Sequence, residues 1–66
     1  MLITVNGGRR TLPEGTRLFT LLEMLGLTPA ATVVERNGSL MDRTQYAEIT
    51  LAEGDILELV RFVGGG

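Results

Sequence analysis

The sequence has 66 residues, which is enough for one small domain and too few for a second core. It contains no cysteine and no histidine, which excludes disulfides, thiolate metal sites, a cysteine nucleophile and the usual general base. Its formal net charge is -2, with six arginines against eight acidic residues and no basic run, which argues against a nucleic-acid-binding surface.

A β-hairpin is predicted at the start of the chain. Residues 1–5 place Met1, Ile3 and Val5 on one face of a strand. They lead into the dipeptide at 6–7, Asn-Gly, which is the pair best suited to supply the two positive φ angles of a two-residue hairpin turn. The return strand is expected over residues 9–12.

One helix is predicted, over residues 17–25. Before it, residues 12–15 place proline at the second and glycine at the fourth position of a type I turn, and Thr16 offers an N-cap hydroxyl. After it, Gly26 can take the left-handed conformation that ends a helix, and Pro29 blocks its continuation. Leucines at helical spacing are expected to face the core: Leu18, Leu21, Leu22 and Leu25.

The middle of the chain predicts one further strand and then short pieces. Residues 32–36 are rich in β-branched side chains, with Val34 expected in the core, and a second Asn-Gly pair ends this strand. Arg36 shares the register of Val34, so we expect it at the sheet rim with its head group in water. Residues 39–50 have no sustained period; Asp42 is expected to open one helical turn, and three side chains are expected to cover the end of the core: Tyr46, Ile49 and Leu51.

The longest strand signal covers residues 56–63. Leu57 and Leu59 fall on one face, and Glu58, Val60 and Phe62 on the other. Because its middle is apolar on both faces, we expect this strand to be central and parallel to the first. The acids that flank Gly54, Glu53 and Asp55, are interpreted as a solvated turn. The order of elements predicts a two-layer α+β domain with a helix on a mixed sheet.

The chain length, this arrangement and three local sequences together resemble a known family. The sequences are VNGG at 5–8, VVERNG at 33–38 and GDILELVRFVGGG at 54–66. They resemble the ubiquitin-like β-grasp sulfur carriers, most closely the ThiS family, which serves thiazole synthesis in the thiamin pathway. The resemblance covers the whole chain. It implies a β-grasp fold, with one main helix on a mixed sheet of four to five strands, in a single domain of residues 1–66 with a flexible glycine tail at 64–66.

The resemblance also implies a sulfur carrier and not an enzyme. The terminal carboxylate of Gly66 would be adenylated by a ubiquitin-activating-like adenylyltransferase of the ThiF type, which uses ATP. Sulfur from a cysteine desulfurase or another persulfide donor would then give a thiocarboxylate on Gly66, which would donate its sulfur in thiazole synthase of the ThiG type. No cofactor is expected on the chain itself.

Partner contacts are expected beside the tail. Val60, Phe62 and Val63 would form an apolar patch on the last strand, where both enzymes would dock. Gly64 and Gly65 suit a tail that threads into a partner, because glycine admits both signs of φ and has the smallest cross-section. The competing structural interpretation is that the apolar residues only cover the sheet edge and that the glycines are a frayed end.

Two other functions remain open. The first is a small subunit of molybdopterin synthase or a carrier for tRNA thiolation, although such subunits often show a Pro-Pro pair where Arg61 and Phe62 stand here. The second is a ubiquitin-like modifier joined to targets through Gly66; with no lysine, this chain could not build chains on its own side chains. The apolar start is too short for a signal peptide or a membrane span, so we expect a soluble cytoplasmic protein with no membrane or nucleic-acid partner.

Overall fold

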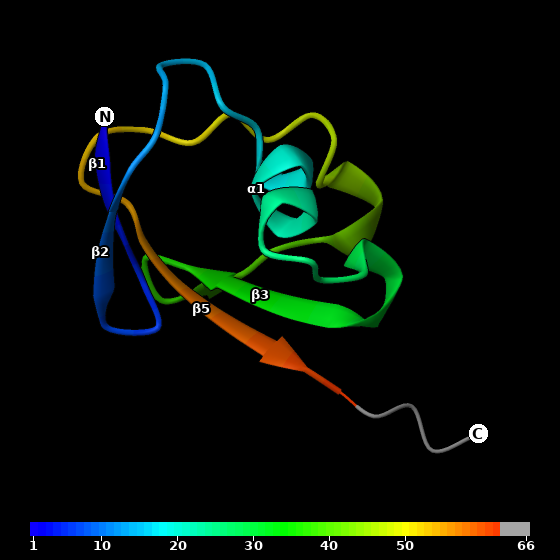
Figure 1. Cartoon of the computed structure of the whole chain (residues 1–66). Coiled ribbons are helices and arrows are strands. Elements are labelled where there is room, and N and C mark those ends of the chain that lie inside the picture. Colours follow the sequence, from blue (N-terminus) through cyan, green and yellow to red (C-terminus); the bar gives the residue numbers. More distant parts are fainter. Residues whose placement is uncertain (63–66) are drawn as a thin grey trace.

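The computed structural model describes residues 1–62 and places one α-helix across one face of a five-stranded mixed sheet (Figure 1). The predicted architecture is confirmed. The strand order is β2-β1-β5-β3-β4. The elements are β1 (Leu2–Val5), β2 (Gly8–Thr11), α1 (Leu18–Met24), the short 3-10 helix η1 (Pro29–Ala31), β3 (Thr32–Arg36), β4 (Ser39–Leu40), the 3-10 helix η2 (Arg43–Gln45) and β5 (Ile56–Arg61). No helix in this part of the chain is long and apolar enough to cross a membrane.

The opening hairpin follows from its turn. Asn6 and Gly7 have φ angles of 48° and 82°, the two positive values that a type I′ turn requires, so the prediction from the Asn-Gly pair is confirmed. β1 and β2 pair in antiparallel register from Val5↔Gly8 outward, and the return strand therefore begins at Gly8, one residue before the predicted start.

The entry to α1 differs from the prediction. The N–H of Thr16 donates to the carbonyl oxygen of Pro13 at 3.3 Å, and Gly15 has a φ of 84° at the third position, which is the feature of a type II turn. The turn thus lies one residue later than predicted. The Thr16 hydroxyl does not cap the helix; it donates to the same Pro13 oxygen at 2.7 Å, and the N-cap position is held by Arg17 without a side-chain hydrogen bond.

The exit from α1 is the predicted glycine stop. Gly26 has a φ of 72°, and its N–H donates to the carbonyl of Glu23 at 3.0 Å. The N–H of Leu27 donates to the carbonyl of Leu22 at 2.9 Å, which completes a Schellman motif. The helix covers residues 18–24 and is one residue shorter at each end than predicted.

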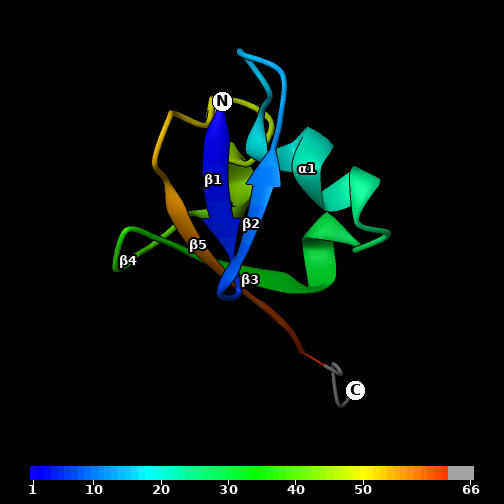
Figure 2. The same cartoon turned by 60° about the vertical axis from the view of Figure 1, so that its left-hand side comes forward.

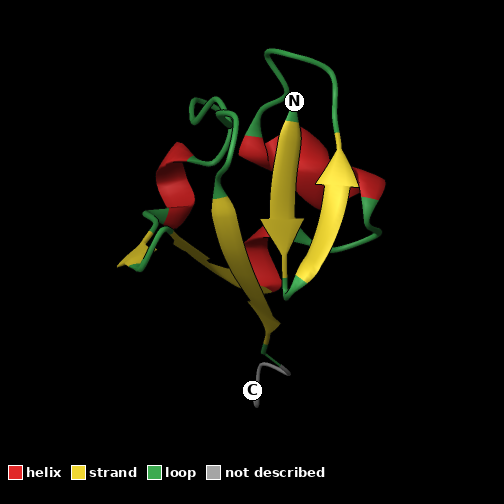
Figure 3. Cartoon of the chain, turned by 90° about the vertical axis from the view of Figure 1, so that its left-hand side faces the viewer, coloured by secondary structure: helices red, strands yellow, loops and turns green. Residues whose placement is uncertain are grey.

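The core lies between α1 and the inner face of the sheet. Leu18, Leu21 and Leu22 are fully buried there, as their spacing predicts, and Leu25 packs against them partly buried. From the sheet and the closing loop the buried side chains are Ile3, Val5, Leu12, Val34, Tyr46, Leu51, Leu57 and Leu59. Figure 3 shows β1 and β2 in front of the helix, so the opposite face of the sheet is open.

The segment between β4 and β5 is irregular apart from the short helix η2, and this confirms the prediction of short pieces. Asp42 opens η2, and its Oδ1 accepts the N–H of Thr44 at 2.9 Å, which lowers the pKa of this carboxyl. Tyr46 is buried, and its hydroxyl donates to the carbonyl of Thr32 at 2.8 Å. Burial raises the pKa of Tyr46. This loop therefore covers the end of the core beside β3.

β5 is central, as predicted. It runs parallel to β1 and antiparallel to β3 and lies between these two strands in the sheet. Figure 2 shows β5 beside β1. Leu57 and Leu59 point into the core, while Ile56, Glu58 and Val60 are exposed on the outer face. The strand ends at Arg61, earlier than the predicted limit of 63, and Val63 lies outside the described residues.

Candidate functional site

The candidate site is the carboxyl end of β5 and the surface beside it. Figure 3 shows β5 extending past the end of β1 toward the chain terminus. β3 supports this end: Thr32 lies opposite Arg61, and the N–H of Phe62 donates to the carbonyl of Ala31 at 3.1 Å. The backbone is thus paired through Phe62, the last residue that the structure describes. Four of the predicted site residues lie outside the described part: Val63 of the predicted apolar patch, Gly64 and Gly65 of the threading tail, and the reactive Gly66.

The structure describes two of the predicted contact residues, Val60 and Phe62, and their surroundings differ. Val60 is 59% exposed on the outer face, opposite Val33 of β3. Phe62 is 40% exposed, and its ring centroid lies 5.7 Å from the guanidinium carbon of Arg43. Arg43 also donates from Nη1 to the carbonyl of Ala30 at 2.8 Å. The Phe62 ring is therefore held by a cation–π contact with η2, which sequence reasoning missed because nothing local links residues so far apart.

Three more large aliphatic side chains are exposed: Leu2, Leu40 and Ile56. They share the outer face with Val60, since Leu2 and Ile56 alternate with core residues and Leu40 lies opposite the exposed Glu35. We call these four residues, Leu2, Leu40, Ile56 and Val60, the outer patch. The strand period was sufficient to find Leu2 and Ile56, which lie out of phase with Ile3 and Leu57. Leu40 belongs to a two-residue strand that gives no such signal.

Three residues of the outer patch flank an acidic pair: Ile56 and Val60 lie two positions before and after Glu58 on β5, and Leu40 lies opposite Glu35. Glu58 of β5 lies directly opposite Glu35 of β3, and both are exposed. Like charges at directly opposed positions of a sheet destabilise the pairing. A basic group placed beside this pair would relieve the repulsion.

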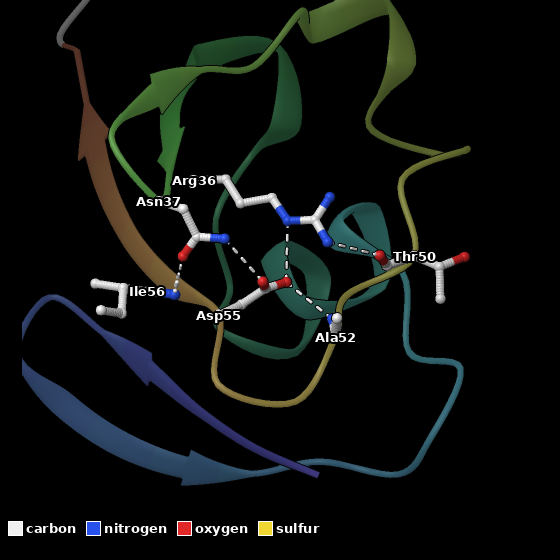
Figure 4. A network of polar contacts seen from close by, with 6 residues as sticks. All are labelled: Arg36, Asn37, Thr50, Ala52, Asp55 and Ile56. Atoms are coloured by element: carbon white, nitrogen blue, oxygen red, sulfur yellow. Dashed lines mark hydrogen bonds and ion pairs between the residues drawn. The ribbon is translucent and has the colours of Figure 1, made fainter.

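The turn before β5 holds a polar network and is not the solvated turn that the sequence suggested (Figure 4). Asp55 is 5% exposed. Its Oδ2 accepts the Nε of Arg36 at 2.9 Å and the N–H of Ala52 at 2.8 Å, and its Oδ1 accepts the Nδ2 of Asn37 at 3.0 Å. Nη2 of Arg36 donates to the carbonyl of Thr50 at 3.2 Å. The prediction that the Arg36 head group lies in water is therefore wrong.

The charge state of Asp55 follows from this network. Burial alone would raise its pKa, but the hydrogen bonds from Ala52 and Asn37 and the charge of Arg36 outweigh burial, so the pKa lies below its usual value. The carboxylate is ionised and fully partnered, which is typical of a structural anchor. Within residues 1–62, no group of three or more acidic side chains is close enough to hold a metal ion.

Comparisons with known protein sequences place this geometry in context. A model described as the ThiS family matches residues 3–66. The chain is 41% identical over 66 residues to a protein of Magnetococcus marinus named thiazole synthase, and 35% identical over 66 residues to one of the same name from Paramagnetospirillum magneticum. Each match covers 100% of this chain and 20% of the relative, so the chain spans about a fifth of the length of these relatives. It is also 39% identical over 46 residues, 70% of each chain, to the sulfur carrier protein ThiS of Bacillus subtilis.

Solved structures of a ThiS protein are also similar to this chain. The crystal structure of the thiamine biosynthesis protein ThiS from Geobacter metallireducens superposes with a TM-score of 0.82 at 35% identity, covering 100% of both chains. Its solution structure superposes with a TM-score of 0.78 and covers 100% of this chain and 88% of the other. These similarities extend over every element described above.

Proposed function

The chain belongs to the ThiS family, and from this premise we propose that it is a sulfur carrier protein of thiamine biosynthesis. The observation that carries the proposal is the family match over residues 3–66, because it runs through β5 and the glycines as far as Gly66. The fold supports it: the central strand β5 lies two residues before the glycine run in sequence, and β3 together with Ala31 pairs with the backbone as far as Phe62.

The proposed chemistry takes place on the main-chain carboxylate of Gly66. This carboxylate is a poor electrophile, so an adenylyltransferase of the ThiF type first joins it to the α-phosphate of ATP and releases pyrophosphate. The terminal sulfur of a persulfide, supplied by a cysteine desulfurase or a similar donor, then attacks the acyl carbon and displaces AMP. A thiol reduces the resulting acyl disulfide and leaves a thiocarboxylate on Gly66. The chain carries the group, and its partners hold ATP and do the chemistry.

The three glycines fit this role by their size. An extended run of three residues reaches roughly 10 Å, enough to enter the active site of a docked partner. Side chains at Gly64 or Gly65 would widen the segment and restrict its φ angles. We therefore assign threading to Gly64 and Gly65, and covalent attachment to Gly66.

Docking is assigned to the surface beside the strand end. Val60 is exposed within the outer patch, and Phe62 presents part of its ring with Arg43 above it. Val63 continues this segment in sequence. An exposed cluster of aliphatic and aromatic side chains next to a reactive terminus is the arrangement expected of a protein interface. The acidic pair, Glu35 and Glu58, favours partners with a basic docking surface.

Thiazole synthase is the proposed sulfur acceptor. Two relatives bear that name. All 66 residues of this chain align with a segment that makes up 20% of each relative. A segment similar to this chain is thus part of a longer protein named for the acceptor reaction, which supports transfer from this carrier to that enzyme. The thiocarboxylate sulfur of Gly66 would act there as the nucleophile.

The test is the intact mass of the purified protein after incubation with its host's adenylyltransferase, ATP, a cysteine desulfurase and cysteine. We expect a mass change equal to the exchange of one oxygen for sulfur, located at Gly66 by fragmentation. A reaction without the desulfurase and a variant that lacks Gly66 are the controls, and both should remain unchanged. No exchange with an adenylyltransferase that is active on a known carrier would contradict the proposal, and stable conjugates with other proteins would indicate a modifier instead.

A further inference from the structure

Both Asn-Gly turns bind β5 through the asparagine side chain, at opposite ends of the strand. Asn37 acts at the beginning. Its side-chain Oδ1 accepts the N–H of Ile56 at 2.8 Å, and its backbone N–H donates to the Ile56 carbonyl at 2.8 Å. Asn6 acts near the end: its Oδ1 accepts the N–H of Leu59 at 2.7 Å, and its Nδ2 donates to the Leu59 carbonyl at 3.2 Å. Each asparagine thus makes two hydrogen bonds to the backbone of one residue of β5.

The contact from Asn6 replaces strand pairing that β1 cannot supply. β1 pairs with β5 only at Thr4↔Ile56 and Val5↔Leu57. The backbone N–H of Asn6 then donates to the carbonyl of Leu57 at 2.9 Å. Its side chain reaches the next backbone groups of β5 on the β1 side, those of Leu59. A side-chain amide carries one acceptor and one donor side by side, like a peptide group, so it continues the ladder.

The residue at this position has to satisfy two conditions. Its φ is 48°, a value that glycine and asparagine adopt more readily than other residues. It must also present both an acceptor and a donor to Leu59. Glycine meets the first condition only, and aspartate lacks the donor, so asparagine meets both. One residue, Asn6, therefore supplies both the backbone conformation of the turn and the side-chain contact with β5.

We propose that Asn6 is a positioning residue for the sulfur-carrying end of the chain, an inference that rests on the proposed function. On the flank that faces β1, Asn6 makes the last hydrogen bonds to β5 within the described residues. Three residues farther on, the only backbone hydrogen bond of Phe62 within the described residues comes from the other flank, where its N–H donates to Ala31. Asn6 thereby fixes the point from which the following segment enters a partner. If this point is loose, more conformational freedom is lost on binding, and productive binding weakens.

The experiment compares two matched variants. Asn6→Gly keeps a residue that tolerates the positive φ and removes both hydrogen bonds to Leu59. Asn37→Gly makes the same change in the same dipeptide of the second turn, where φ is 51°, and removes the side-chain contacts to Ile56 and Asp55 at the beginning of β5. Amide hydrogen exchange of Phe62 is measured in each full-length protein, together with KM and kcat for adenylation by the host's adenylyltransferase.

For Asn6→Gly, we expect exchange of the Phe62 amide to accelerate by roughly tenfold, because the strand end opens locally. We expect KM to rise by about fivefold, with kcat changed by less than about twofold, because positioning acts on binding of the tail. Asn6→Asp, which keeps the acceptor and loses the donor, should shift both quantities in the same direction. Asn37→Gly should lower global stability more than Asn6→Gly, since it removes a partner of Asp55, and should leave the Phe62 exchange and KM near wild type.

The opposite pattern would overturn the proposal. If Asn6→Gly leaves Phe62 exchange and KM at wild-type values, or if Asn37→Gly raises KM as much, Asn6 stabilises only the fold. The two proposals fail separately. A wild-type protein that takes up no sulfur would contradict the proposed function, whereas the exchange rate of Phe62 would still decide whether Asn6 holds the end of the strand.

Discussion

Replacing Asp55 with asparagine is expected to lower the free energy of unfolding by about 2 to 3 kcal/mol. The side chain is 6% exposed and accepts hydrogen bonds from Arg36, Asn37 and the Ala52 backbone. An amide at this position can accept with one oxygen only, so its NH2 group must face at least one of these donors. Leaving a buried donor unpaired costs about 1–3 kcal/mol, and a broken buried ion pair costs about 3–5 kcal/mol. The Arg36 side chain is 25% exposed, so water compensates part of the loss.

This loss would be a large share of the total. Domains are stable by about 0.05–0.15 kcal/mol per residue, which gives roughly 3–10 kcal/mol for a chain of this length. The assay is urea unfolding followed by circular dichroism, with the midpoint and the slope compared. Glu53→Gln is the matched control, because Glu53 lies in the same turn, is exposed, and keeps its acceptor for the N–H of Leu2. It should change stability by less than about 0.5 kcal/mol.

The pH dependence provides a second test. The pKa of Asp55 is lowered in the folded state, so its contribution is fully present above the unfolded value of about 3.9 and is lost as pH falls through the folded pKa. The difference in stability between wild type and Asp55→Asn should therefore be constant near neutral pH and shrink below about pH 4. Equal stability of the two proteins at neutral pH would refute the view that this network anchors β5.

Three further perturbations address the surface beside the strand end. Phe62→Ala should weaken binding to the adenylyltransferase or to thiazole synthase by more than about 1 kcal/mol, as measured by calorimetry; unchanged affinity for both would reduce Phe62 to a structural role. Glu58→Gln should raise the free energy of unfolding by about 0.5 kcal/mol, because it removes the repulsion with Glu35. It should also slow association with a basic partner at low salt. Faster association would contradict the charge argument. Arg43→Met keeps most of the aliphatic side chain and loses both the cation–π contact with Phe62 and the hydrogen bond to Ala30. It should lower the free energy of unfolding by about 1 kcal/mol, measured by thermal unfolding. No change would mean that neither contact stabilises the fold.

The parts of the fold that depend on neighbouring residues could be predicted from the sequence. The Asn-Gly turn at 6–7, the glycine stop of the helix and the Asp42 turn each follow from the φ angles or hydrogen bonds that one or two residues favour. The leucine spacing was sufficient to place α1 on the core. Local chemistry thus determines where most elements begin and end.

Predictions failed where the outcome depended on contacts between distant residues. Arg36 and Asp55 are 19 positions apart, and neither residue type indicates that the two meet. Thr16 had an equally good local alternative, since its hydroxyl reaches the Pro13 carbonyl made available by the preceding turn. The role of Asn6 at Leu59 spans 53 positions and appears only once β1 and β5 lie side by side.

We expect the contacts that hold β5 to separate effects on stability from effects on function along a single strand. At its beginning, Asn37 and Asp55 join the strand to the rest of the sheet, and their loss is expected to reduce global stability. At its end, Asn6 acts on one flank and Ala31 on the other, and we expect this backbone to open locally and to contribute less to global stability. Variants at the beginning should therefore shift the unfolding midpoint with little effect on KM, and variants at the end should do the reverse. A central strand permits this division, because neighbours hold it on both flanks, whereas the proposed function places partner binding at its end.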